Sequence, residues 1–130
     1  MLSIINDMER IGDICYQLSI TIQRKNEQKA YFTPELRKTV EEMMLEVQKA
    51  LTIMNKNLDS EYSQVSITDA NEAETIINNM RNKLRKNYLQ KIQKGEFNIE
   101  TGMIYINLIH SFEKVGDHIY NISEAIEESK

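Results

Sequence analysis

The sequence contains little of what crosslinks a protein chain or anchors it in a membrane. Its 130 residues include one Cys, one Pro, four Gly and no Trp. A single Cys excludes an internal disulfide bond and a zinc site built from cysteines, and it is typical of a reducing compartment. No apolar run approaches membrane-spanning length, and the N-terminus lacks the basic and apolar segments of a signal peptide. We therefore expect a cytoplasmic chain that does not insert into the membrane.

Basic charge and catalytic motifs are also scarce. Sixteen Lys and Arg residues stand against twenty Asp and Glu residues, for a formal net charge of −4. Such a chain has no general attraction for nucleic acid, so we do not expect nucleic acid as a partner. A phosphate-binding loop, an HExxH zinc motif and a GxSxG nucleophile motif are all missing from the sequence. We therefore expect a chain that is not an enzyme.

Helical periodicity dominates what is present. Apolar residues recur at spacings of three and four, which predicts amphipathic helices over residues 2–28, 34–62, 68–94 and 99–128. Thr33 and Pro34 form a strong helix start, Asn98 is a candidate cap, and Gly95 is a typical helix end. Four such helices with short links predict an all-α protein, an antiparallel four-helix bundle in one domain over residues 1–130.

The first helical segment starts its apolar pattern with no capping residue in front of it. Its apolar seam comprises Ile4, Met8, Ile11, Cys15, Leu18 and Ile22. A helix that is in full register from residue 2 predicts that Met1 lies within a longer helix, in the C-terminal fragment of a longer chain. The place of Cys15 on the seam predicts a buried thiol.

One pentapeptide occurs twice in the chain. Residues 9–13 read ERIGD and residues 113–117 read EKVGD. The agreement continues at a constant offset, since Tyr16 matches Tyr120 and Ser19 matches Ser123. Like charges four residues apart destabilise a helix by a few tenths of a kcal/mol, and a helical Gly costs about 1 kcal/mol relative to Ala. This unfavourable arrangement occurs in both copies, which indicates that a function compensates for its cost.

Metal binding is one such function. Carboxylates that converge from neighbouring helices suit hard or borderline cations such as Mg²⁺, Ca²⁺, Mn²⁺ or iron. The candidate ligands for a divalent or iron-type ion are Glu113, Asp117, Glu9, Asp13 and, from the third helix, Glu74. The alternative is a solvated acidic face, because the E-x-x-x-D spacing is common by chance. The repetition leaves both interpretations open.

These motifs resemble the signature of the PhoU family. EKVGDHIYNISE, over residues 113–124, is similar to the motif that ends each three-helix repeat of that family, and DMERIGDI, over residues 7–14, resembles an earlier copy. ETIINNMR (74–81) and KGEFNIETGM (94–103) look like the variant appended to bacterial type II sodium/phosphate cotransporters. The resemblance spans nearly the whole chain. It implies metal ions held by the E-x-x-x-D motifs, with Glu9, Asp13, Glu113 and Asp117 as ligands and Glu74 as a further candidate.

The resemblance implies a cytoplasmic regulatory or accessory domain of a sodium-dependent phosphate transporter, at the inner face of the plasma membrane. Such a domain would bind metal and act by contact without catalysis. Its partner would be a membrane transporter domain, upstream in the same chain or in a separate protein. Two alternatives stay open: a free-standing PhoU-type regulator of phosphate uptake and signalling, and a structural helical bundle without bound metal.

Two departures from the family pattern concern the first repeat. Its first two helices are missing from this sequence, and Ile14 and Cys15 follow its motif where the family has His-Ala. The missing helices would leave Ile and Met side chains of the first helix uncovered. Exposed apolar patches seek partners, so we expect self-association into a homo-oligomer.

Overall fold

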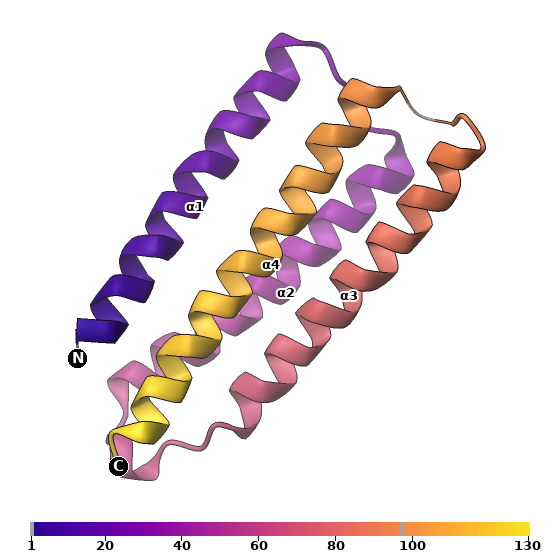
Figure 1. Cartoon of the computed structure of the whole chain (residues 1–130). Helices are drawn as coiled ribbons and strands as arrows, with labels where there is room; N and C mark the ends of the chain where they lie inside the picture. Colours follow the sequence, from indigo (N-terminus) through magenta and orange to yellow (C-terminus); the bar gives the residue numbers. More distant parts are fainter. Residues whose placement is uncertain (1, 97) are drawn as a thin grey trace.

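The computed structural model describes residues 2–96 and 98–130 and consists of four long helices (Figure 1). The helices are α1 (Leu2–Glu27), α2 (Pro34–Asp59), α3 (Thr68–Gln93) and α4 (Ile99–Glu128), with a 3-10 turn, η1 (Tyr62–Gln64), before α3. Successive helices run in opposite directions along the bundle. The predicted all-α bundle is confirmed. Across the described residues, none of the helices combines the length and the apolar character needed to cross a membrane.

The helix ends follow from local sequence chemistry. The hydroxyl oxygen of Thr33 accepts a hydrogen bond from the Leu36 amide at 3.2 Å, and the Asn98 side-chain oxygen accepts one from the Thr101 amide at 2.8 Å. Such caps satisfy amide groups that have no partner within the helix. Gly95 adopts a φ of 72° after α3, a conformation that glycine reaches without strain.

The sequence pattern predicted that the second helix ends at residue 62. In the structure α2 ends three residues earlier, at Asp59. Ser60 has an extended backbone, and its amide donates to the Asn57 carbonyl. Residues 62–64 then form η1 as a separate turn. The helical periodicity of the sequence therefore extends beyond the last helical residue of α2.

Helix α4 is the centre of the bundle. It packs against α1, α2 and α3, while α2 and α3 also pack against each other. Thirteen residues of α4 are buried, against two in α1, because α4 has neighbours on several sides and α1 packs chiefly on α4. Three helices therefore surround a shared core, and α1 lies along one edge of it (Figure 1).

The apolar seam predicted for α1 is only partly buried. Ile4 and Leu18 are buried and Ile11 packs against the core, whereas Met8 and Ile22 are 42% and 44% exposed. Cys15 is exposed, so the prediction of a buried thiol was wrong. The reason is geometric: a helix that packs on one neighbour buries a narrow stripe, and the remaining seam residues lie on its flank.

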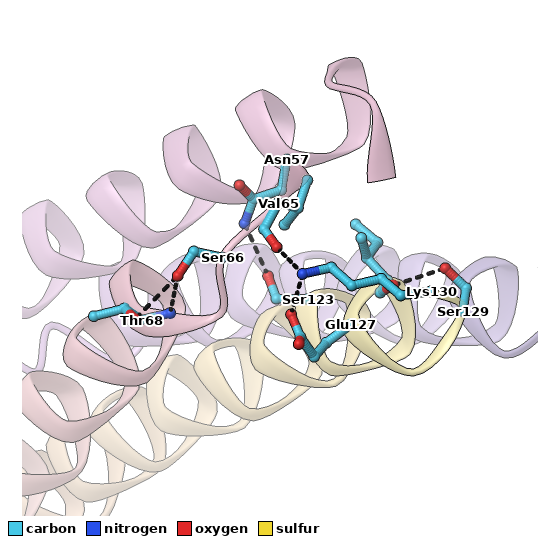
Figure 2. A network of polar contacts seen from close by, with 9 residues as sticks. Asn57, Val65, Ser66, Thr68, Ser123, Glu127, Ser129 and Lys130 are labelled. Carbon is cyan, nitrogen blue, oxygen red and sulfur yellow. Dashed lines mark hydrogen bonds and ion pairs between the residues drawn. The ribbon is translucent and has the colours of Figure 1, made fainter. Parts of the chain in front are cut away.

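Polar contacts close the end of the bundle at which α4 terminates (Figure 2). The Asn57 side-chain amide donates to the Ser123 hydroxyl at 3.5 Å, and both residues are buried. Lys130 donates to the Val65 carbonyl and forms an ion pair with Glu127 at 3.0 Å. Asn57 lies on α2 and Ser123 on α4, so their contact ties these two helices together inside the core.

Candidate functional site

The second copy of the repeated motif lies where α3 and α4 approach each other closely. A Cβ atom on Gly116 would lie 3.1 Å from Cδ1 and 3.2 Å from Cγ2 of Ile77, a side chain that is 1% exposed. A larger residue at position 116 would have to displace a packed core side chain. Glycine therefore allows the contact that sets Glu113 and Asp117 of α4 beside the polar residues of α3.

Arg81 of α3 is the cation at this motif. One of its terminal nitrogens lies 3.6 Å from Oε1 of Glu113, and these side chains are 27% and 12% exposed. The separation exceeds that of a charge-assisted hydrogen bond, so the pair is held mainly by charge attraction. Nε of Arg81 is buried and has no hydrogen-bond partner among residues 2–96 and 98–130.

Two carboxyl groups at the motif have raised pKa values. Burial is the main cause for Asp117, and the neighbouring Glu113 raises its pKa further, against the opposing effects of His118, Arg81 and His110. Burial is also the main cause of the raised pKa of Glu74, followed by repulsion from Asp117 and Glu124. Because Asp117 of α4 helps to raise the pKa of Glu74 of α3, the two carboxyl groups lie near each other across the α3–α4 contact.

The group of Glu74, Glu113 and Asp117, which we call the acidic cluster, contains a further oxygen. Asn78 forms a side-chain hydrogen bond that lowers the pKa of Glu74. The Asn78 side-chain oxygen is buried, and no donor for it is present in the described part of the chain. The buried oxygen without a donor and the repulsion among the carboxylates are two unfavourable features that a bound hard cation would compensate.

The first motif is not brought to the acidic cluster. Glu9 and Asp13 are exposed on α1, and no atom lies within 4 Å of a Cβ built on Gly12. Asp13 lines a separate groove of about 270 Å³ between α1 and α4, together with His110, Lys114 and His118. The two copies of the motif therefore have different surroundings.

Neither motif presents a complete set of metal ligands as the side chains stand. Within residues 2–96 and 98–130, no three His, Cys, Asp or Glu side chains are grouped closely enough to hold a metal ion. At the acidic cluster, Glu113 faces Arg81, which competes with a cation for the same carboxylate. Of the five predicted ligands, Glu74, Glu113 and Asp117 share one site, and Glu9 and Asp13 lie elsewhere.

One polar contact between α1 and α4 was missed by the sequence reasoning. Nδ1 of His118 lies 2.9 Å from Oδ1 of Asp7, and the Asn121 side-chain amide donates to the same oxygen at 3.4 Å. Asp7 lies three residues after Ile4 and four before Ile11, so it interrupts the face of α1 that meets α4. A single acidic residue between apolar positions of one helix face was the feature of the sequence from which this contact could have been predicted.

Comparisons with known proteins assign a family to the chain. Residues 33–126 match the PhoU domain family. The phosphate-specific transport system accessory protein PhoU homolog 1 of Thermotoga maritima (strain ATCC 43589 / DSM 3109 / JCM 10099 / NBRC 100826 / MSB8) is 25% identical over 126 residues, which cover 93% of this chain and 51% of that protein. The chain thus spans about half the length of this curated relative. No solved structure matches. The chain belongs to the PhoU domain family, in agreement with the prediction that it is not an enzyme.

Proposed function

We propose that this chain is a regulatory accessory domain of a phosphate transport system, which acts by contact with a transporter and not by catalysis. The observation that supports this most is the PhoU domain match over residues 33–126, which includes the second motif and the helices around it. The relative from Thermotoga maritima is itself a phosphate transport accessory protein. In this proposal the domain works in the cytoplasm, at the inner face of the membrane.

The acidic cluster is the proposed sensor of this domain. Raised pKa values of Glu74 and Asp117 mean that their ionised forms lack sufficient compensating charge. A divalent or iron-type cation would supply that charge, and Glu113 and the Asn78 side-chain oxygen are the further oxygens at hand. Binding of the ion would have to compete with Arg81 for Glu113, so the occupied and empty states would differ in the α3–α4 contact.

Phosphate uptake by cells tests the accessory function. We expect deletion of the gene to change the dependence of uptake on external phosphate, and the wild-type chain to restore it. Asp117→Asn should fail to restore it, because a charge of the acidic cluster is lost. Asp13→Asn is the matched control, since it makes the same change at the repeat-related and exposed position, and it should restore normal uptake. A deletion that leaves phosphate uptake unchanged would contradict the proposed function.

The identity of the transporter partner separates two forms of the proposal. A free-standing accessory protein, like the relative from Thermotoga maritima, is the form that the comparison supports better. A domain fused to a sodium/phosphate cotransporter is the other form, and it predicts membrane spans encoded in frame upstream of Met1. A structural bundle without bound metal is a third possibility. It predicts that Asp117→Asn restores phosphate uptake as well as Asp13→Asn does.

A further inference from the structure

A groove between α3 and α4, beside the acidic cluster, carries basic side chains. It has a volume of about 250 Å³ and is lined by Arg81, Arg85, Ile106, Ile109 and His110. We call it the basic groove, because no carboxylate is among the described residues that line it. Ile109 is buried and Ile106 packs against the core, so the basic side chains stand beside apolar ones. Apolar neighbours lower the local dielectric constant, which strengthens the attraction between an arginine and an anion.

The protein leaves the two arginines of the basic groove incompletely paired. They lie four residues apart on α3, a spacing at which like charges repel. Arg85 is exposed and forms no ion pair within residues 2–96 and 98–130. Arg81 lies 3.6 Å from Glu113, beyond the usual length of a charge-assisted hydrogen bond. Both guanidinium groups therefore keep hydrogen-bond donors that an anion would satisfy.

The surface around the basic groove is also positive. A second groove, between α1 and α4, shares His110 and is lined by Arg10 and Lys114, with Asp13 as the carboxylate among its described lining residues. The whole chain has a net charge of −4, so this concentration of basic residues is a local feature. A local positive field draws anions to this face, although the protein as a whole repels them.

The donors of the basic groove suit a phosphate group. A guanidinium group presents its N–H groups in a planar fork, which can donate two parallel hydrogen bonds to the oxygens of a phosphate. The volume of about 250 Å³ is below the range of about 300–1,000 Å³ that is typical of drug-sized ligands, so the groove suits a small anion. We infer that the basic groove binds a phosphate group through Arg81, Arg85 and His110.

Arg81 connects the basic groove to the acidic cluster. It lines the groove and also faces Glu113, so a bound phosphate and Glu113 compete for the same guanidinium group. A cation at the acidic cluster competes with Arg81 for Glu113. Each ligand therefore releases the group that the other one needs, and phosphate binding favours cation binding. The phosphate site rests on the groove alone, whereas this linkage also rests on the proposed function.

Isothermal titration calorimetry with inorganic phosphate, in the presence of a chelator, tests the site. We expect Arg85→Gln to raise the phosphate dissociation constant about tenfold, because a pair of charge-assisted hydrogen bonds is lost. Lys83→Gln is the matched control, since Lys83 is exposed on the same helix and lies outside the lining of the groove. It removes the same charge and should change the dissociation constant by less than about twofold, because exposed charges are screened.

Sedimentation with vesicles separates two sources of the phosphate group, the free ion and a membrane lipid. The probes are phosphatidylcholine vesicles with and without phosphatidic acid. Binding of inorganic phosphate identifies the free ion as a ligand, and binding only to vesicles that contain phosphatidic acid identifies the lipid. In either case Arg85→Gln should weaken binding and Lys83→Gln should not. Binding of neither probe, or equal effects of the two substitutions, would overturn the inference.

Glu113→Gln tests the link through Arg81 without any metal ion. Loss of the Glu113 charge leaves Arg81 to phosphate alone, so the phosphate dissociation constant in chelator should fall about three- to fivefold. Glu124→Gln is the control, since it makes the same change about 16 Å further along α4. Equal effects of both substitutions would contradict the linkage, while phosphate uptake by cells is the separate test of the proposed function. Circular dichroism that matches the wild type confirms that each variant is folded.

Discussion

Asp117 and Glu74 are carboxyl groups whose surroundings favour their neutral forms. Burial raises both pKa values; repulsion from Asp117 raises that of Glu74 further, and repulsion from Glu113 raises that of Asp117. Arg81 offsets only part of this repulsion, because it lies beside Glu113. Unfavourable groups persist where function or binding compensates for them, and this is the physical basis for our proposal that these residues bind a cation.

The raised pKa values predict how stability depends on pH. The ordinary pKa values are 3.8 for Asp117 and 4.5 for Glu74, and both are higher in the folded protein. The folded state therefore binds more protons than the unfolded state from these values upward, so these groups make the free energy of unfolding fall as pH rises through that range. Asp117→Asn should reduce the fall and stabilise the metal-free protein at pH 7 by about 0.5 kcal/mol.

Urea unfolding in the presence of a chelator, repeated across the acidic and neutral pH range, measures this effect. Asp13→Asn serves as the control, because Asp13 is exposed on α1 and lies outside the acidic cluster. The control should keep the pH dependence of the wild type. The account of the acidic cluster fails if Asp117→Asn and Asp13→Asn change the pH dependence by the same amount.

The two motif glycines should respond in opposite ways to replacement by Ala. Gly116→Ala places a Cβ against the buried Ile77 side chain, so we expect a loss of 1–2 kcal/mol in stability, on the order of other overpacked core sites. Gly12→Ala meets no atom within 4 Å and should gain up to about 1 kcal/mol from helix propensity. Chemical denaturation of both variants and of the wild type measures the two effects. Equal effects of both substitutions would show that the motif copies have equivalent surroundings.

Among the elements, α1 is the helix with the weakest attachment to the core. It buries only Ile4 and Leu18 and packs chiefly on α4, so local opening of α1 exposes less apolar surface than opening of any other helix. The contact of Asp7 with His118 and Asn121 is therefore a large share of its specific attachment. The partly packed Ile11 and Ile14 supply the rest.

Removal of this contact should loosen α1 without unfolding the bundle. Asp7→Ala takes a carboxylate away from His118 and Asn121, and we expect α1 docking to weaken by about 1–2 kcal/mol. Hydrogen exchange should then speed up at the amides of α1, while the amides of α4 keep their wild-type rates. Glu9→Ala is the control on an exposed residue of the same helix, with an expected change within about 0.5 kcal/mol. Equal acceleration in α1 and α4 would mean that the four helices open as one unit.

At the scale of the whole molecule, the sequence predicted the helices well because their periodicity is a local property. Thr33 and Asn98 cap the helices that they were expected to start, since capping depends on residues within one turn. Burial in α1 was predicted poorly, because Met8, Cys15 and Ile22 continue the apolar spacing but stay exposed on the flank of the stripe that α4 covers. Periodicity shows which residues share a face; the number of neighbouring helices decides how much of that face is covered.

The candidate site was predictable to a similar extent. The repeated motif predicted Glu113 and Asp117 as candidates, and Glu74 was the candidate expected from the third helix. Arg81 and Asp7 were missed as partners, because each acts across a helix–helix contact and not along its own helix. The different surroundings of Gly12 and Gly116 were equally invisible in the sequence, since the repeat is the same at both positions.

Thermal unfolding of the wild type, Asp117→Asn and Asp13→Asn, each with chelator and with added Mg²⁺, Mn²⁺ or Fe²⁺, tests the central claim most directly. A bound cation stabilises the folded state by mass action, about 2.7 kcal/mol at a hundredfold excess over its dissociation constant. We predict that metal raises and chelator lowers the melting temperature of the wild type and of Asp13→Asn, and that Asp117→Asn responds to neither. Identical melting curves with metal and with chelator for all three proteins would contradict the claim that the acidic cluster binds a cation.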